Sequence, residues 1–175
     1  MTKSSTTAVV NLVNLNLSPA YNDIFLRAIA FNDEDIISRI KDETGFGAEL
    51  FEDLKLFLIL ARFRQLDFAH NHSPKPSLSI DDDLYILDQA WHTFLLFTED
   101  YQLFCTQNLG SFIHHIPIRQ SERSFEFAQW LKDKNQWEQK KKDAFKEELF
   151  WLSRYLHPDK IKEWFIDKKW RKISL

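Results

Sequence analysis

The sequence predicts an all-α fold, with a single compact multi-helix domain at residues 18–175 and an extended N-terminal arm at residues 1–17. Three observations support this prediction. The chain of 175 residues is long enough to bury its own core. Its composition, 44% hydrophobic and 15% aromatic, supplies bulky core side chains. Nearly every segment after residue 18 spaces its apolar residues three or four positions apart, as an amphipathic helix does.

Start and stop signals predict three helices in the first part of the chain. Ser18-Pro19 begins the first, because serine is a capping residue and proline is favoured at the first helical position. Residues 32–35 begin the second, and their acidic side chains suit the positive end of a helix dipole. Gly45 and Gly47 end it. The third spans about residues 48–68, with apolar residues spaced by four, three and four: Leu50, Leu54, Phe57 and Ala61.

The second part of the chain is divided by two predicted loops. Residues 70–77 contain two prolines and are the clearest loop, and residues 111–120 form another. Between them, the acidic run at residues 81–83 opens one helix, and Thr98-Glu99-Asp100 opens a shorter one that stops at Gly110. We expect the remaining helices at about residues 121–132, 136–156 and 158–171.

The N-terminal arm differs from the rest of the chain. Asn14 to Leu17 alternates polar and apolar residues, which suits an extended segment lying on the helices or pairing with a partner chain. Asparagines interrupt its apolar runs, so it lacks the core of a signal peptide. The longest apolar stretch elsewhere is Leu56–Ala61, far shorter than the roughly 20 residues of a membrane span. With one cysteine, Cys105, no internal disulfide forms. We therefore expect a soluble cytoplasmic protein without a membrane partner.

Charge is unevenly distributed along the chain. The net charge is −3, but residues 132–175 hold thirteen basic and eight acidic residues. Tryptophans lie among these lysines, and aromatic residues beside basic ones can bind single-stranded nucleic acid. The basic excess is small, and the tryptophan spacings also fit faces turned toward a helical core. We therefore interpret the tryptophans as core residues and expect no nucleic-acid partner.

The residue types that carry metal chemistry gather between positions 88 and 117. Asp88 and His92 are four apart and share a helix face, Cys105 follows on the next helix, and His114 and His115 come shortly after. If the two helices fold against each other, Asp88, His92, Cys105 and one of the paired histidines converge. Carboxylate, imidazole and thiolate are ligands for Zn²⁺ or Fe²⁺. Asp88 would alternatively orient a ligating histidine.

The order of these residues resembles the conserved core of the glycine-rich domain-containing protein-like family. The pattern that carries the resemblance is Asp88-x-x-Trp91-His92, then Tyr101, Cys105, Gly110 and His114. The chain departs from that core at Phe94, where family members usually have a second histidine, and it has no glycine-rich tail. The resemblance implies a helical architecture and a site, and it implies no reaction.

A second motif lies near the C-terminus. His157-Pro158-Asp159-Lys160 matches the tripeptide and following lysine of J-domain cochaperones. Only fifteen residues follow it, which is too few for the further helix that a J-domain needs. We interpret Pro158 as the start of the last helix, with Asp159 in its first turn.

Two classes of function remain. The first is a protein-interaction module in which the Trp91-His92 pair and the two adjacent histidines hold the loop at residues 111–117 in shape for a protein partner. The second is a metal-binding protein or enzyme that uses zinc or iron held by Asp88, His92, Cys105 and His114 or His115. We favour the first, because the sequence contains no complete set of catalytic residues. Enzymatic activity stays open.

Overall fold

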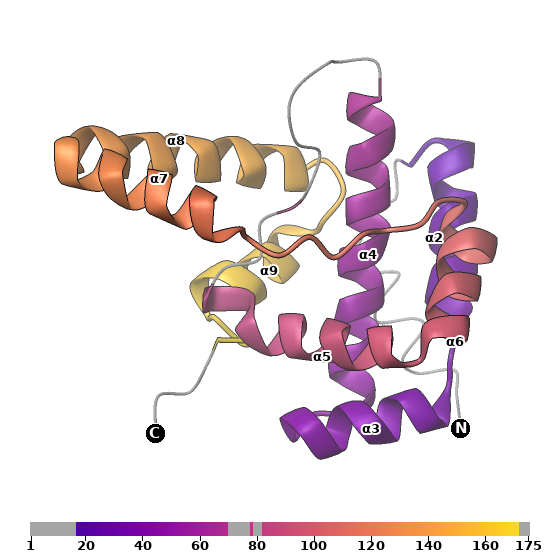
Figure 1. The fold of residues 1–175 in the computed structure, drawn as a ribbon. Helices are drawn as coiled ribbons and strands as arrows, with labels where there is room; N and C mark the ends of the chain where they lie inside the picture. The colour runs from indigo at the N-terminus through magenta and orange to yellow at the C-terminus, as the bar shows by residue number, and fades with distance from the viewer. Residues whose placement is uncertain (1–16, 70–77, 79–81, 172–175) are drawn as a thin grey trace.

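The computed structural model describes residues 17–69, 78 and 82–171, and its regular structure over those residues is helical throughout (Figure 1). Residues 1–16 of the predicted arm at residues 1–17 and the predicted loop at residues 70–77 lie outside the described residues. The α-helices are α2 Pro19–Ala30, α3 Glu34–Thr44, α4 Ala48–Phe68, α5 Tyr85–Leu96, α6 Thr98–Leu103, α7 Gln120–Lys132, α8 Lys134–Leu152 and α9 Pro158–Ile161. Three short segments complete them: the 3-10 turn η1 Asp82–Leu84 and the π-helices η2 Phe104–Leu109 and η3 Lys162–Ile166.

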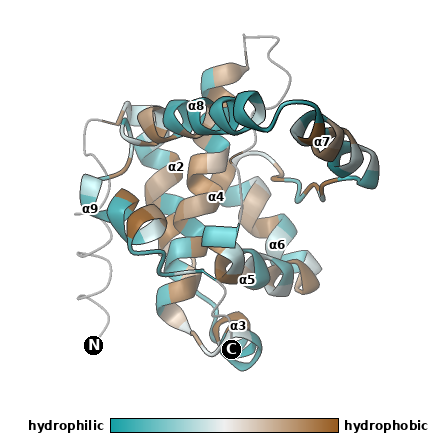
Figure 2. Cartoon of the chain, turned by 90° about the vertical axis from the view of Figure 1, so that its left-hand side faces the viewer, coloured by the Kyte–Doolittle hydropathy of each residue, from teal (hydrophilic) through white to brown (hydrophobic). Residues whose placement is uncertain are grey.

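Helix α4 forms the centre of the molecule, and α2, α3 and α5 pack against it (Figure 1). Its apolar residues do not form one stripe, because every residue from Leu54 to Ala61 is buried. A helix that is hydrophobic all round is buried on all sides. Figure 2 accordingly shows α4 as a largely hydrophobic helix enclosed by more polar ones.

Local signals explain several of the helix ends. Ser18 stands at the N-cap position of α2 before Pro19, as predicted, but its side chain makes no capping hydrogen bond. The Asp33 carboxylate accepts from the backbone N–H groups of Asp35 and Ile36 and caps α3. Gly45 and Gly110 end their helices in the left-handed conformation, at φ values of 82° and 72°.

Two predictions were wrong in detail. The helix that opens at Thr98 is not a single α-helix up to Gly110, since α6 ends at Leu103 and continues as η2. No single helix spans residues 158–171, since α9 ends at Ile161 and continues as η3.

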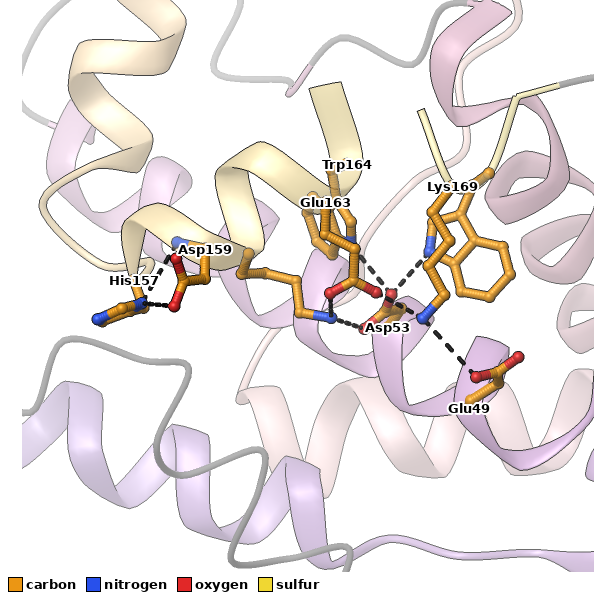
Figure 3. Close-up of polar contacts among 9 residues, drawn as sticks. Glu49, Asp53, His157, Asp159, Glu163, Trp164 and Lys169 are labelled. Atoms are coloured by element: carbon orange, nitrogen blue, oxygen red, sulfur yellow. Dashed lines mark hydrogen bonds and ion pairs between the residues drawn. The ribbon is translucent and has the colours of Figure 1, made fainter. Parts of the chain in front are cut away.

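Asp53 of α4 fastens the C-terminal segment to the core (Figure 3). Its Oδ1 accepts from Lys160 Nζ at 2.8 Å. Its Oδ2 accepts from the indole N–H groups of Trp164 at 3.0 Å and Trp170 at 2.7 Å. All four side chains are buried, so one carboxylate satisfies three buried donors.

Asp67, near the C-terminal end of α4, likewise fastens distant parts of the chain to this helix. It accepts from the hydroxyls of Tyr21 and Tyr155, each at 2.6 Å, and from Trp151 Nε1 at 2.8 Å. Burial alone would raise the pKa of Asp67, but these hydrogen bonds outweigh it and hold the pKa below its ordinary value. The same contact and burial raise the pKa of Tyr21 to about 12.

These contacts account for three of the C-terminal tryptophans. Trp151, Trp164 and Trp170 are buried and hydrogen-bonded, as the core interpretation predicts, so their faces are not available to stack on bases. The interpretation was wrong for Trp130 and Trp137, which are only partly buried, because the part of the hairpin of α7 and α8 that carries them does not pack its faces into the core. None of the helices in the described ranges is both long enough and apolar enough to cross a membrane.

Candidate metal centre

Helix α5 presents Asp88 and His92 on one side, one turn apart. The adjoining side of the helix is apolar and anchors it, because Leu87, Ala90, Trp91 and Phe94 are buried. Asp88 and His92 lie at the border of this buried side, with side chains 22% and 49% exposed. The amphipathic pattern of α5 therefore holds both side chains at the surface on a rigid element.

The chain returns to α5 after η2. Gly110 adopts the left-handed conformation, and the Ser111 N–H donates to the Cys105 carbonyl, which turns the chain sharply out of the π-helix. Arg62 of α4 donates to the Leu109 carbonyl at 3.1 Å and holds this turn against the core. The segment at residues 111–119 then leads on to α7 (Figure 1).

Tyr101 fixes the returning segment to α5. Its buried hydroxyl donates to the Ile113 carbonyl at 2.6 Å and accepts from Trp91 Nε1 at 3.0 Å. Burial raises the pKa of Tyr101 well above its ordinary value, so the hydroxyl keeps its proton for this bridge. The bridge sets the position of the segment two residues before His115.

His115 therefore lies next to both Asp88 and His92 of α5. Its Nε2 lies 2.9 Å from Asp88 Oδ1, and its ring packs edge-on against Trp91 with centroids 4.5 Å apart. His92 Nδ1 lies 3.7 Å from Asp88 Oδ2, and the two imidazole rings are 4.4 Å apart. One ligand atom from each of Asp88, His92 and His115 falls within 4.8 Å of the others. The His115 side chain is only 18% exposed, so the group opens to solvent mainly along His92.

The other two predicted site residues lie elsewhere. Cys105 is fully buried in the core, where burial raises the pKa of its thiol. It is not part of the group formed by Asp88, His92 and His115. The His114 ring packs against Phe112, at a centroid distance of 4.9 Å, and the side chain is exposed. Of the two neighbouring histidines, the structure therefore brings only His115 to Asp88.

Two further residues position the group. The sequence predicts for Trp91 a part in holding the loop at residues 111–117, but it indicates Tyr101 only as a member of a pattern. Trp91 supports the His115 ring, and Tyr101 ties Trp91 to the returning segment. A signal for the pair was present, because tryptophan and tyrosine in an apolar stretch need a hydrogen-bond partner once they are buried. Their spacing of ten residues across two helices does not reveal that they partner each other.

The motif His157-Pro158-Asp159-Lys160 begins the helix α9, as the sequence predicts. Pro158 stands at the first position of α9, and Asp159 lies in its first turn. His157 Nδ1 accepts from the Asp159 N–H and caps the helix, and Lys160 turns inward to Asp53 (Figure 3). These contacts make the motif a structural link between α9 and α4.

One comparison with known proteins finds a match. The model of a family described as UCP032817-like matches residues 30–147, which is more than half of the chain and includes Asp88, His92 and His115. No curated protein and no solved structure matches the chain. The family description names no activity, so the chemistry of the site has to be argued from its own geometry.

Proposed function

Because this chain belongs to the UCP032817-like family, whose description names no activity, we propose from the site itself that it binds a divalent transition metal through Asp88, His92 and His115. The observation that carries the proposal is the convergence of two imidazoles and one carboxylate within 4.8 Å. Zn²⁺ and Fe²⁺ are the ions that this set of ligands suits best.

The distances within the group support this proposal. Around a tetrahedral zinc ion with ligands at about 2.1 Å, neighbouring ligand atoms lie roughly 3.4 Å apart. The distances from the Asp88 carboxylate, 2.9 Å from Oδ1 to His115 and 3.7 Å from Oδ2 to His92, bracket that value. Rotation of the exposed His92 side chain and a small separation of Asp88 from His115, which are hydrogen-bonded here, would complete the geometry, because α5 and the Tyr101 bridge hold the backbone on both sides.

The number of protein ligands, three, also indicates the type of metal site. Structural zinc sites are closed by four protein ligands, whereas sites that react keep a position for water or a substrate. Two histidines and one carboxylate on one side of a metal are likewise typical of iron sites with open positions. The proposed site is therefore of the open type.

A specific observation also favours a second function. Beyond His115, Ile116 and Ile118 are 73% and 57% exposed on the segment that Tyr101 and Asp88 hold in place. In this alternative, the contact between Asp88 and His115 is a clamp, and the two isoleucines are presented to a protein partner. Exposed apolar residues on a fixed segment are typical of such surfaces.

A metal titration distinguishes these functions. Protein treated with a chelator and then titrated with Co²⁺ should bind one ion per chain, with visible absorption bands from the coordinated metal. His92→Ala should abolish this binding without unfolding the protein, since the His92 side chain is half exposed. His114→Ala is the matched control and should bind as the wild type does. Binding that survives His92→Ala and His115→Ala alike would contradict the proposed site and leave the clamp.

A further inference from the structure

The hairpin of α7 and α8 leaves apolar surface uncovered. Helix α7 packs against α8 but contributes no buried side chain, although it carries Phe125 and Leu131, each 64% exposed. In Figure 1 the hairpin extends sideways from the central helix. Helices in proteins are stabilised mainly by burying an apolar face, which α7 does not do within one chain. An additional partner for this hairpin is therefore expected.

A groove runs between the two helices. It has a volume of about 920 Å³, and Phe125 and Gln129 of α7 line one side of it. The α8 side presents Gln136, Lys140, Asp143 and Glu147, which are spaced by four, three and four and so form one stripe along the helix. A continuous helical stripe beside a groove is suited to receive another helix.

The order of the charges along this stripe indicates which helix could pack against it. Lys140 and Glu147 are exposed, opposite in sign and seven residues apart. Among the described residues neither has an ion-pair partner, unlike Lys141, which pairs with Glu126, and Asp143, which pairs with Lys146. When two copies of such a helix run antiparallel about a two-fold axis midway between the two residues, each lysine faces the other copy's glutamate. A two-fold interface is self-complementary in this way.

The middle of the stripe permits a close approach. Ala144 also lines the groove and lies beside the midpoint between Lys140 and Glu147. Its small side chain lets two helix backbones come near each other, because interhelical distance depends on the side chains at the contact. Phe125 lies on the other wall of the groove, where a second helix would cover it.

We propose that the occupant of this groove is a second copy of the chain, and that α8 of each copy packs antiparallel against α8 of the other. The two hairpins then form a four-helix arrangement with two symmetric ion pairs between Lys140 and Glu147. This inference does not depend on the metal site, since no residue of the groove belongs to that group.

Reversing the charges of Lys140 and Glu147 tests the proposal. The association of the full-length chain is measured by sedimentation velocity over a concentration series, with circular dichroism as the check of folding. Lys140→Glu and Glu147→Lys should each weaken self-association at least about tenfold, because each places like charges opposite one another twice. The double variant K140E/E147K should restore association to within about threefold of the wild type, since it recreates both pairs in reverse. Lys142→Glu, an equal charge change at an exposed residue outside the groove, should have no effect.

Mixing the two single variants gives the sharpest result. In the mixture, a chain with two acidic residues at these positions faces one with two basic residues. Equimolar K140E and E147K should therefore form a heterodimer at concentrations where each variant alone is mostly monomeric. Three results would each overturn the proposal: a monomeric wild type at every concentration, single variants that associate like the wild type, or a mixture that stays monomeric.

Discussion

Asp53 Oδ2 accepts a hydrogen bond of 2.7 Å from the indole N–H of Trp170, a residue 117 positions further along the chain. This contact, together with Lys160 and Trp164 on the same carboxylate, joins the C-terminal segment to the first part of the central helix (Figure 3). The carboxylate is buried, and its hydrogen bonds to three donors offset the cost of that burial.

Asp53→Asn should lower the free energy of unfolding by about 1–3 kcal/mol, because it removes one of the two carboxylates that pair with buried Lys160 and replaces the charged acceptor of two buried indoles. Urea unfolding monitored by circular dichroism measures this change. Glu49→Gln is the control, since its contact with Lys169 is 3.7 Å long and exposed, and it should cost less than about 0.5 kcal/mol. Equal effects of the two substitutions would show that the Asp53 contacts do not hold the C-terminal segment.

Protonation of Asp67 should lower the stability of the folded protein in acid. Its pKa is lower in the folded chain than in the unfolded one, so its contribution is present above the unfolded pKa, about 4, and is lost as the pH falls through the folded value. Unfolding free energies measured from neutral pH down to acid should therefore fall more steeply for the wild type than for Asp67→Asn. Parallel curves for the two proteins would remove Asp67 from the acid response.

Tyr101→Phe should lower the unfolding free energy by about 1–3 kcal/mol, because it leaves buried Trp91 Nε1 and the Ile113 carbonyl without their partner. It should also weaken metal binding, since the hydroxyl holds the segment that carries His115. Stability and Co²⁺ affinity are both measured on the same preparation. A loss of stability with unchanged affinity would mean that Asp88 and Trp91 position His115 without the Tyr101 bridge.

Cys105 should behave as a core residue. Burial raises the pKa of its thiol, so a thiol reagent at neutral pH should react with it only as fast as the protein opens, and rapidly in denaturant. Cys105→Ser should leave Co²⁺ binding unchanged, in contrast to His92→Ala. Fast modification of the native protein, or loss of metal with Cys105→Ser, would return the thiol to the list of ligands.

The sequence predicted most helices because their signals are local. The limits of α4 at residues 48–68 follow from the glycines before it and the length of its apolar stretch, and Asp33 and Gly45 cap α3 as their residue types indicate. The continuation of α9 as a π-helix was missed, since the contacts from Lys160 and Trp164 to Asp53 come from 107 and 111 positions away. The resemblance to the glycine-rich domain-containing protein-like family stays a prediction.

The sequence by itself determined that the fold is helical and that Asp88 and His92 share one face of α5, because a helix repeats every 3.6 residues whatever surrounds it. Tertiary structure decided which of two adjacent histidines meets them. Neighbouring side chains on a non-helical segment diverge, and the Tyr101 bridge sets the segment so that His115 faces Asp88 while His114 turns to Phe112. It likewise placed Cys105 in the core, because the side that a helix buries depends on the elements packed against it.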